Sequence, residues 1–416
     1  MRAWTCLLAL GALAFAGSSQ AGALKLDGFF DLRVVNPSNT QSWETGGPGK
    51  LRFDGNGGQD LNAEIPQVAI QGRAQLTQDL SGVVLLRYAP DQKTAVDLIE
   101  SYLRYRPVST TPWRGSLKIG IFFPPISLEN TELGWTSPWT LTPSAINSWV
   151  GEELRTLGSE VTIEHRLEKS TFQVEAALYG WNDPAGIMLA DRGWALGDKP
   201  TGLFDRMRLP DAVSISRGAS GPMHTLTYQE IDNRPGWYAG ASWRIEDVVR
   251  IDVLRYDNSA NAAALDRQFA WRTKFWSAGV SVPFGEFTLL TQAMHGQTII
   301  GPIRTFKSVT DFDSAYALVG WTRGEVRLAA RAEVFGTVER HPHQVHDEDD
   351  EDYPPDPELS EHGHAFTFAA NWLPRPYLRL TAEVLHLYSY RAQREAVGLP
   401  PNLRETQMQF NLRTFF

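Results

Sequence analysis

The chain ends in the sequence TQMQFNLRTFF, residues 406–416, in which apolar and polar side chains alternate. One face carries Thr406, Met408, Phe410, Leu412, Thr414 and Phe416. The opposite face carries Gln407, Gln409, Asn411 and Arg413. Alternation with period two indicates a β-strand that has one apolar and one polar face. The same pattern recurs at residues 26–34, 66–76, 326–334 and 378–384.

Strand-like segments follow one another along the whole chain. We predict strands at residues 24–34, 62–78, 83–89, 95–106, 116–123, 157–166, 171–181, 236–245, 248–256, 268–282, 286–298, 311–322, 325–335, 363–373, 377–390 and 403–416. Many of them exceed the length of about 5–6 residues that is usual in soluble proteins. Short connections, such as 79–82 and 323–324, alternate with long ones, such as 124–156 and 182–235. This layout is typical of outer-membrane barrels.

The composition excludes other classes of protein. The 416 residues are 42% hydrophobic and 21% charged, with a mean hydropathy of -0.28, whereas a helical membrane protein needs several apolar runs of about 20 residues. Lys and Arg number 39 against 48 Asp and Glu, and a nucleic-acid binder normally has a basic excess. In hydrocarbon every backbone polar group must be paired, so strands span a bilayer only as a closed barrel. We therefore predict an all-β fold, a transmembrane antiparallel up-and-down β-barrel of about 16 strands over residues 22–416, with long extracellular loops and short periplasmic turns.

The first residues have the layout of a secretory signal peptide. Arg2 supplies a positive charge, residues 7–17 are apolar, and Ser19 and Ala21 occupy the small-residue positions of a cleavage site. We expect residues 1–21 to be removed on export, and we expect the mature protein to lie in the cell outer membrane. Cys6, the one cysteine of the chain, falls inside the apolar run, so disulfides are not expected to stabilise the fold.

Two regions resemble the phosphate-selective porin family. The sequence KIGIFFPPISLEN, residues 118–130, is similar to a family segment in which a strand ending in Gly-x-Phe runs into a Pro-containing loop with Leu-Glu-Asn. Residues 362–391 and 405–416 are similar to the last three strands of that family. The resemblance implies an outer-membrane porin. Family members crowd the loop with Lys and Arg, whereas this loop has four Glu and one Arg, which argues against phosphate specificity.

By similarity to general porins, the loop 124–156 is predicted to fold into the barrel and narrow it. Its candidate constriction residues are Glu129, Glu132, Glu152, Glu153 and Arg155. The predicted pore wall carries Arg73, Arg104, Arg327, Arg331, Glu333, Arg379, Glu383 and Arg413. Arginines that face loop carboxylates would create a transverse field, and rings of charge set ion preference. The alternative is that these charges pair with one another and only satisfy a polar interior.

Three further features remain open at the level of sequence. The ending with Phe410, Leu412 and Phe416 resembles the signal that the barrel-assembly machinery recognises. In the acidic loop 336–362, His341, His343, Asp347 and Asp349 could hold a metal, although a solvated outer loop explains the same composition. The loop 182–235 combines apolar and charged residues, and it either plugs the mouth or contacts a neighbouring subunit.

The favoured function is a porin, a passive diffusion channel for small hydrophilic solutes or ions. One alternative is a substrate-specific channel for anionic nutrients, and another is an outer-membrane enzyme or adhesin that the barrel anchors. Enzymatic motifs such as Gly-x-Ser-x-Gly and His-Glu-x-x-His are absent from the sequence, so we expect neither catalysis nor a cofactor. The expected partners are outer-membrane lipids, the barrel-assembly machinery and the permeating solutes, but no nucleic acid. A homotrimer is expected by analogy with porins alone.

Overall fold

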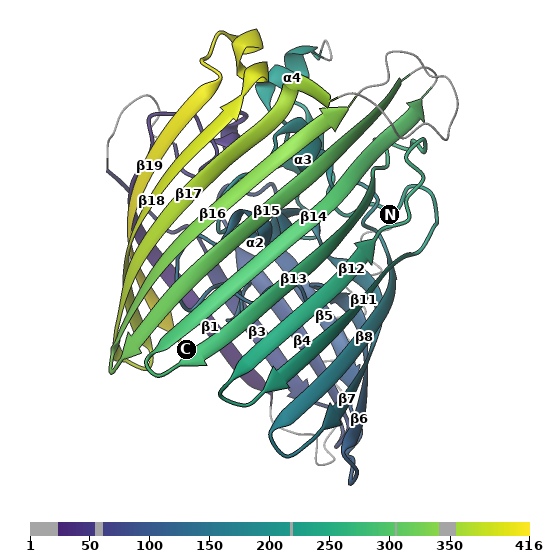
Figure 1. The fold of residues 1–416 in the computed structure, drawn as a ribbon, viewed down its shortest axis with the longest axis vertical. Coiled ribbons are helices and arrows are strands. Elements are labelled where there is room, and N and C mark those ends of the chain that lie inside the picture. Colours follow the sequence, from purple (N-terminus) through teal and green to yellow (C-terminus); the bar gives the residue numbers. More distant parts are fainter. Residues whose placement is uncertain (1–23, 55–60, 217–218, 304–305, 341–354) are drawn as a thin grey trace.

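A computed structural model describes residues 24–54, 61–216, 219–303, 306–340 and 355–416 (Figure 1). The expected signal peptide and the candidate metal ligands His341, His343, Asp347 and Asp349 lie outside the described residues. Among the described residues, we find no helix with the length and apolar character needed to cross a membrane.

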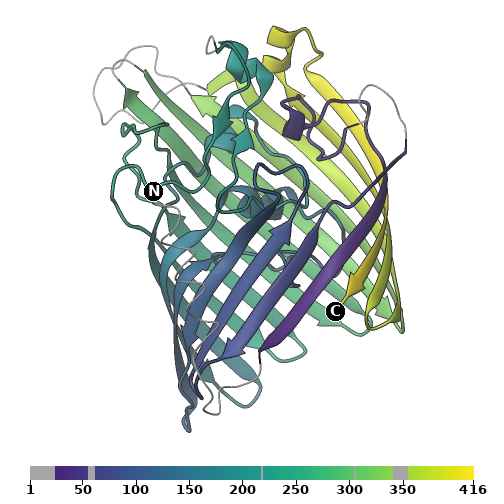
Figure 2. The same cartoon turned by 180° about the vertical axis from the view of Figure 1, so that it is seen from behind.

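The strands form one antiparallel sheet that curls into a barrel (Figures 1 and 2). They are β1 (Lys25–Asn36), β2 (Asn62–Glu64), β3 (Val68–Gln75), β4 (Leu80–Tyr88), β5 (Val96–Tyr105), β6 (Trp113–Phe122), β7 (Thr156–Arg166), β8 (Ser170–Gly180), β11 (Gly236–Ile245), β12 (Val249–Asp257), β13 (Arg272–Phe284), β14 (Phe287–Ile303), β15 (Phe306–Arg323), β16 (Val326–Arg340), β17 (Pro355–Arg375), β18 (Leu378–Arg391) and β19 (Asn402–Phe415). Every predicted strand overlaps an observed one.

The 17 strands of the sheet make a barrel of 16, because β2 and β3 are two parts of one barrel strand. Both pair with β1, β2 opposite residues 33–35 and β3 opposite residues 25–30. Pro66 lies between the two parts, and proline has no amide hydrogen for the ladder. The barrel closes where β1 pairs with β19, from Phe29 opposite Phe415 to Asn36 opposite Met408. The predicted fold and strand count are confirmed.

The two faces of each strand differ as the alternation predicted. In β19, Phe410 is 50% exposed on the outer face, whereas the adjacent Asn411 is fully buried inside. In β16, Leu328 and Val334 face outward, whereas Arg331 and Glu333 are buried in the lumen. An apolar exterior around a polar interior is the design of a transmembrane barrel.

Two long loops occupy the lumen. L3 (residues 123–155) contains α2 (Ala145–Glu153), and L4 (residues 181–235) contains α3 (Ile187–Asp191), β9 (Met207–Arg208), α4 (Asp211–Ser216) and β10 (His224–Thr225). Figures 1 and 2 show α2 and α3 within the ring of strands. L1 (residues 37–61), with η2 (Trp43–Thr45), and L8 (residues 392–401), with η3 (Ala392–Val397), lie at the same end of the barrel as α4. We call this the long-loop end, and the opposite end the short-turn end.

L3 and L4 pack on one side of the lumen through a buried aromatic cluster. Trp149 of α2 has its ring centre 5.5 Å from that of Phe275 and 5.3 Å from that of Phe312, on β13 and β15. Trp194 of L4 lies 6.0 Å from both Trp149 and Phe312. Truncating a buried aromatic side chain of this kind to alanine costs about 3–5 kcal/mol, so this cluster fixes both loops to the barrel wall.

The face assignment on β3 can be tested with two neighbouring residues. Ile70 faces outward and is 42% exposed, whereas Gln71 faces a cavity inside the barrel. Placing Arg at Ile70 should destabilise the barrel by about 2–4 kcal/mol because a guanidinium would enter hydrocarbon. Gln71→Arg, the matched control, should cost much less. Urea unfolding in bilayers measures both, and equal losses would contradict the assigned faces.

Candidate pore constriction

A buried ion pair fastens L3 to the barrel wall. The Glu129 carboxylate lies 2.5 Å from an Arg331 guanidinium nitrogen, and both side chains have zero solvent exposure. Glu129 also accepts hydrogen bonds from the Ser144 amide, at 2.9 Å, and from the Asn147 side chain, at 3.0 Å. Arg331 in turn pairs with Glu333 at 3.0 Å. These charges satisfy one another inside the protein, as the alternative reading of the sequence allowed.

Two wall carboxylates hold the main chain of L3. Glu333 accepts a hydrogen bond of 2.7 Å from the amide of Ala145, the first residue of α2. The unpaired amides and the dipole of a helix N-terminus favour a negative charge at that point. Glu383 accepts bonds of 2.6 and 3.1 Å from the amides of Leu141 and Thr142. The wall charges therefore determine where the loop lies.

Glu132 is the predicted loop carboxylate that meets wall arginines and still faces solvent. It accepts two hydrogen bonds from Arg379, at 2.7 and 2.9 Å, and lies 4.0 Å from Arg327. The side chains of Glu132 and Arg327 are 27% and 30% exposed. Among the predicted constriction residues, Glu132 is therefore the one that solvent reaches.

Below L3, toward the short-turn end, a cavity of about 770 Å³ holds more of the predicted wall residues. Arg73 pairs with Asp27 at 3.0 Å and is 52% exposed, and Arg104 lies 5.7 Å from the centre of the Tyr102 ring. The charged residues that line this vestibule are Lys25, Arg73, Glu100, Arg104 and Glu132. Asp27 also lies 2.9 Å from Lys25, so with this neighbouring carboxylate the charges of the vestibule balance.

Glu152, Glu153 and Arg155 are placed differently from the expectation that they oppose wall arginines. Glu152 pairs with Arg192 of L4 at 2.6 Å. Glu153 accepts hydrogen bonds from the Trp149 indole, at 2.5 Å, and from main-chain amides of α3 and its N-cap. Arg155 donates to main-chain carbonyls and stacks 3.4 Å from the centre of the Phe123 ring. The physical reason is that L4 occupies the space beside the end of α2, so these charges join the two loops.

Arg413 belongs to a second buried charge group, on β1 and β19. It lies 2.7 Å from Asp31, which is also 3.5 Å from Arg33. Arg413 donates a further hydrogen bond of 3.1 Å to the Thr136 hydroxyl of L3. Arg413 was predicted in the wall and Arg33 was not singled out, because alternation shows which face a side chain occupies but not which side chains on that face pair with one another.

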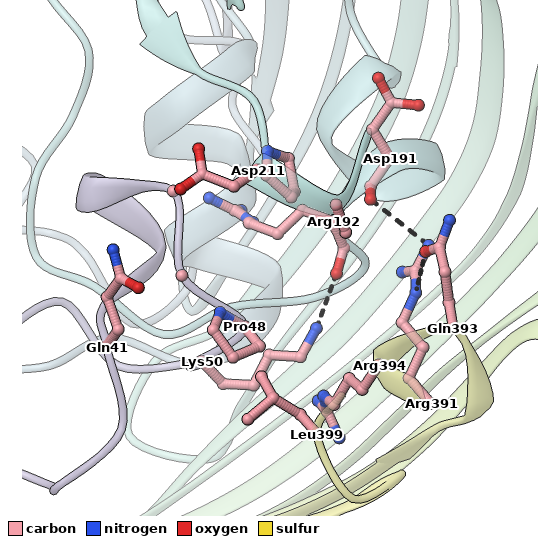
Figure 3. A pocket seen from close by; sticks show the side chains of 14 residues that line it. Gln41, Pro48, Lys50, Asp191, Arg192, Asp211, Arg391, Gln393, Arg394 and Leu399 are labelled. Carbon is pink, nitrogen blue, oxygen red and sulfur yellow. Dashed lines mark hydrogen bonds between the residues drawn. The ribbon is translucent and has the colours of Figure 1, made fainter. Parts of the chain in front are cut away.

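At the long-loop end, L1, L4 and L8 meet around a pocket of about 260 Å³ (Figure 3). Lys50 donates hydrogen bonds of 2.7 Å to the main-chain carbonyl of Arg192 and to Glu361. Burial, together with the nearby charges of Arg394 and Arg391, lowers the pKa of Lys50 to about 7 against the opposing effect of Glu361. Arg391 donates to the carbonyl of Ala190 at 3.0 Å. These bonds attach the outer part of L4 to its neighbouring loops.

Three carboxylates lie close together where L4 leaves the barrel wall and returns to it. Ligand atoms of Asp183, Glu230 and Asp232 lie within 4.8 Å of one another. Asp183 accepts a hydrogen bond of 2.6 Å from the Ile231 amide, which ties the beginning of L4 to its end. Burial raises the pKa of Asp183 to about 7, with the neighbouring carboxylates acting in the same direction.

Comparison with solved structures identifies the class of fold. Outer-membrane expressed OmpT of Vibrio cholerae superposes with a TM-score of 0.50 at 9% identity, over 97% of this chain and 100% of that chain. OmpT with loop L8 deleted gives 0.52 at 8% identity, over 95% and 100%. The outer membrane channel DcaP of Acinetobacter baumannii gives 0.52 at 9% identity, over 97% and 99%. The chain therefore has the fold of the outer-membrane channel barrels. No protein-family model matches the chain, and no curated protein matches it.

The anchoring role of Arg331 can be tested against its neighbour Arg327. Replacing Arg331 by methionine leaves Glu129 and Glu333 buried without their cation, and we expect a loss of about 3–5 kcal/mol in the free energy of unfolding. Arg327→Met removes a partly exposed charge and should cost about 1 kcal/mol or less. Urea unfolding of the refolded barrel measures both. Equal stability of the two variants would contradict an anchoring role for Arg331.

Proposed function

We propose that the protein is an outer-membrane porin, a passive diffusion channel for small hydrophilic solutes or ions. The observation that carries this proposal is the partly exposed pair Glu132 and Arg327, which lies beside the buried Arg379 at the edge of a charged vestibule inside a closed barrel. An apolar exterior suits the barrel to a lipid bilayer, and the short-turn end, where both β1 and β19 have their free ends, would face the periplasm.

A selective channel for anionic nutrients is the second candidate. Arg104 of the vestibule favours it slightly, because this arginine has no carboxylate within ion-pair distance among the described residues. Membership of the phosphate-selective porin family remains a hypothesis that rests on residues 118–130 and the last three strands. The acids of L3 argue against phosphate as the solute, since Glu129 and Glu132 compensate the arginines beside them.

Assembly and oligomerisation are further parts of the proposal. The outward-facing side chains of Phe410 and Leu412 would contact lipid. The barrel-assembly machinery would recognise the end of β19. Homotrimerisation rests on the analogy with porins.

Planar-bilayer recordings test the channel function and the role of Glu132. The wild type should conduct, and Glu132→Gln should shift the reversal potential in a KCl gradient toward anion selectivity because a solvent-facing negative charge is lost. Arg327→Gln should shift it toward cations. Both shifts should shrink as salt rises, since the Debye length falls from about 10 Å at 0.1 M to about 3 Å at 1 M.

Glu168→Gln is the matched control for these recordings, because Glu168 is an exposed carboxylate in the short turn between β7 and β8. It should leave the reversal potential unchanged. A wild type without conductance would refute the channel function. Equal shifts in all three variants would refute the assignment of the constriction.

Deletion of Phe416 tests the assembly signal. The Phe416 main chain exchanges hydrogen bonds of 2.8 and 3.0 Å with Gly28, and its side chain is 62% exposed. We expect a lower amount of folded protein in the outer membrane, measured as the heat-modifiable band. Phe416→Tyr keeps an aromatic end and should restore the band. Wild-type levels after deletion would count against the signal.

A further inference from the structure

The segment Leu196–Asp205 of L4 lies between L3 and the wall formed by β1, β4 and β5. On the L3 side, the Gly197 amide donates to the Ser148 hydroxyl at 3.1 Å, and the Thr201 amide donates to the Gly151 carbonyl at 3.1 Å. On the wall side, the Leu203 amide donates to the Leu98 carbonyl at 3.0 Å. We call residues 196–205 the plug, since most of them are buried between L3 and the barrel wall.

Three buried arginines converge on Asp198 in the plug. Arg33 of β1 and Arg52 of L1 each lie 2.7 Å from one of its two carboxylate oxygens. Arg87 of β4 donates to the main-chain carbonyls of Asp198, at 2.8 Å, and Pro200, at 3.3 Å. The three arginine side chains come from separate parts of the chain and are all almost fully buried.

The arginines have more donor groups than the plug uses. Nη2 of Arg33, Nε of Arg52 and Nε of Arg87 are buried, and within the described part of the chain each makes no hydrogen bond. Arg33 has Asp31 nearby at 3.5 Å, and Arg52 has Asp91 at 3.0 Å and Glu44 at 3.6 Å. Arg87 donates its two Nη atoms to carbonyl groups of the plug, and its Nε has no acceptor among the described residues. Buried N–H groups without an acceptor are costly, which favours a ligand that supplies oxygen atoms.

We propose that Arg33, Arg52 and Arg87 form a carboxylate-binding site on the permeation path, which Asp198 occupies as an internal ligand when the channel is closed. This inference rests on the proposed channel function and adds its regulation. A small monocarboxylate presents the same two oxygen atoms as the Asp198 side chain, and guanidinium groups bind carboxylates through paired hydrogen bonds. Such a solute would compete with Asp198 and release the plug.

The local sequence suits a segment that can detach. Gly197 and Gly202 flank the sequence Asp198–Thr201, and glycine permits a wide range of backbone conformations. A Cβ atom at Gly202 would approach the Asp97 carboxylate to 2.3 Å, so the seated plug also requires glycine there. The base of L4 stays tied by Asp183 and its neighbours, so that movement of the plug leaves the barrel intact.

Single-channel recording of Asp198→Asn tests the proposal. Loss of the internal carboxylate should raise the mean conductance several-fold and shift the reversal potential toward anions, because two arginines then face the path without this counter-charge. Asp211→Asn is the matched control, since Asp211 lies on the same loop, pairs with Arg208 at 2.8 Å and is 43% exposed at its side chain. It should behave as wild type. Folding of each variant is verified by the heat-modifiable band.

Sodium acetate provides a second measurement that uses the wild type. Replacing chloride by acetate at constant ionic strength should lengthen the open time of the wild type and of Asp211→Asn. The open time of Asp198→Asn should not change, because in this variant the plug no longer has a carboxylate that holds it to the arginines. If the wild type conducts and Asp198→Asn has the same conductance and selectivity, the role of residues 196–205 as a plug is refuted. The channel function then still stands. An equal response to acetate in Asp198→Asn would overturn the carboxylate site. Absence of conductance in wild type and Asp198→Asn would overturn the channel function and this inference together.

Discussion

The pairing of β1 with β19 is the interaction on which the rest of the structure depends. It leaves the sheet without a free edge, and in hydrocarbon an edge of unpaired backbone groups would be prohibitively costly. The closed ring has 16 strands, and a barrel of this size is too wide for its wall side chains to fill alone. L3 and L4 fold into the lumen and fill part of the remaining space.

The lumen is divided into two chemically different halves. On the side of β13 and β15, Trp149 and Trp194 pack against Phe275 and Phe312, and this aromatic cluster resembles the core of a soluble protein. On the side of β1 and β4, the filling is charged. Buried ion pairs add little net stability compared with well-packed apolar residues. The charged half is thus expected to contribute less net stability than the aromatic half.

The sequence alone was sufficient for the barrel, because period-two alternation and the spacing of turns are local properties. It also named Glu132 as a loop carboxylate and Arg379 as a wall arginine, but alternation could not tell that these two residues pair. It did not place Glu152 and Glu153, because their partners lie on L4, and contacts between two long loops leave no periodic signal. Asp198 was missed for the same reason. Its sequence neighbourhood shows only one acid between two glycines, and its partners Arg33 and Arg52 come from distant parts of the chain.

L3 and L4 are both attached by buried charges, but L3 has two kinds of attachment to the wall. Glu333 and Glu383 of the wall accept hydrogen bonds from main-chain amides of L3. In addition, Arg331 and Arg379 of the wall pair with Glu129 and Glu132 of L3. A carboxylate solute competes for arginines, but it cannot take the place of an amide donor. At the plug, Arg33 and Arg52 pair with the single carboxylate of Asp198. Under the proposed carboxylate site, the exchangeable contact therefore lies on L4.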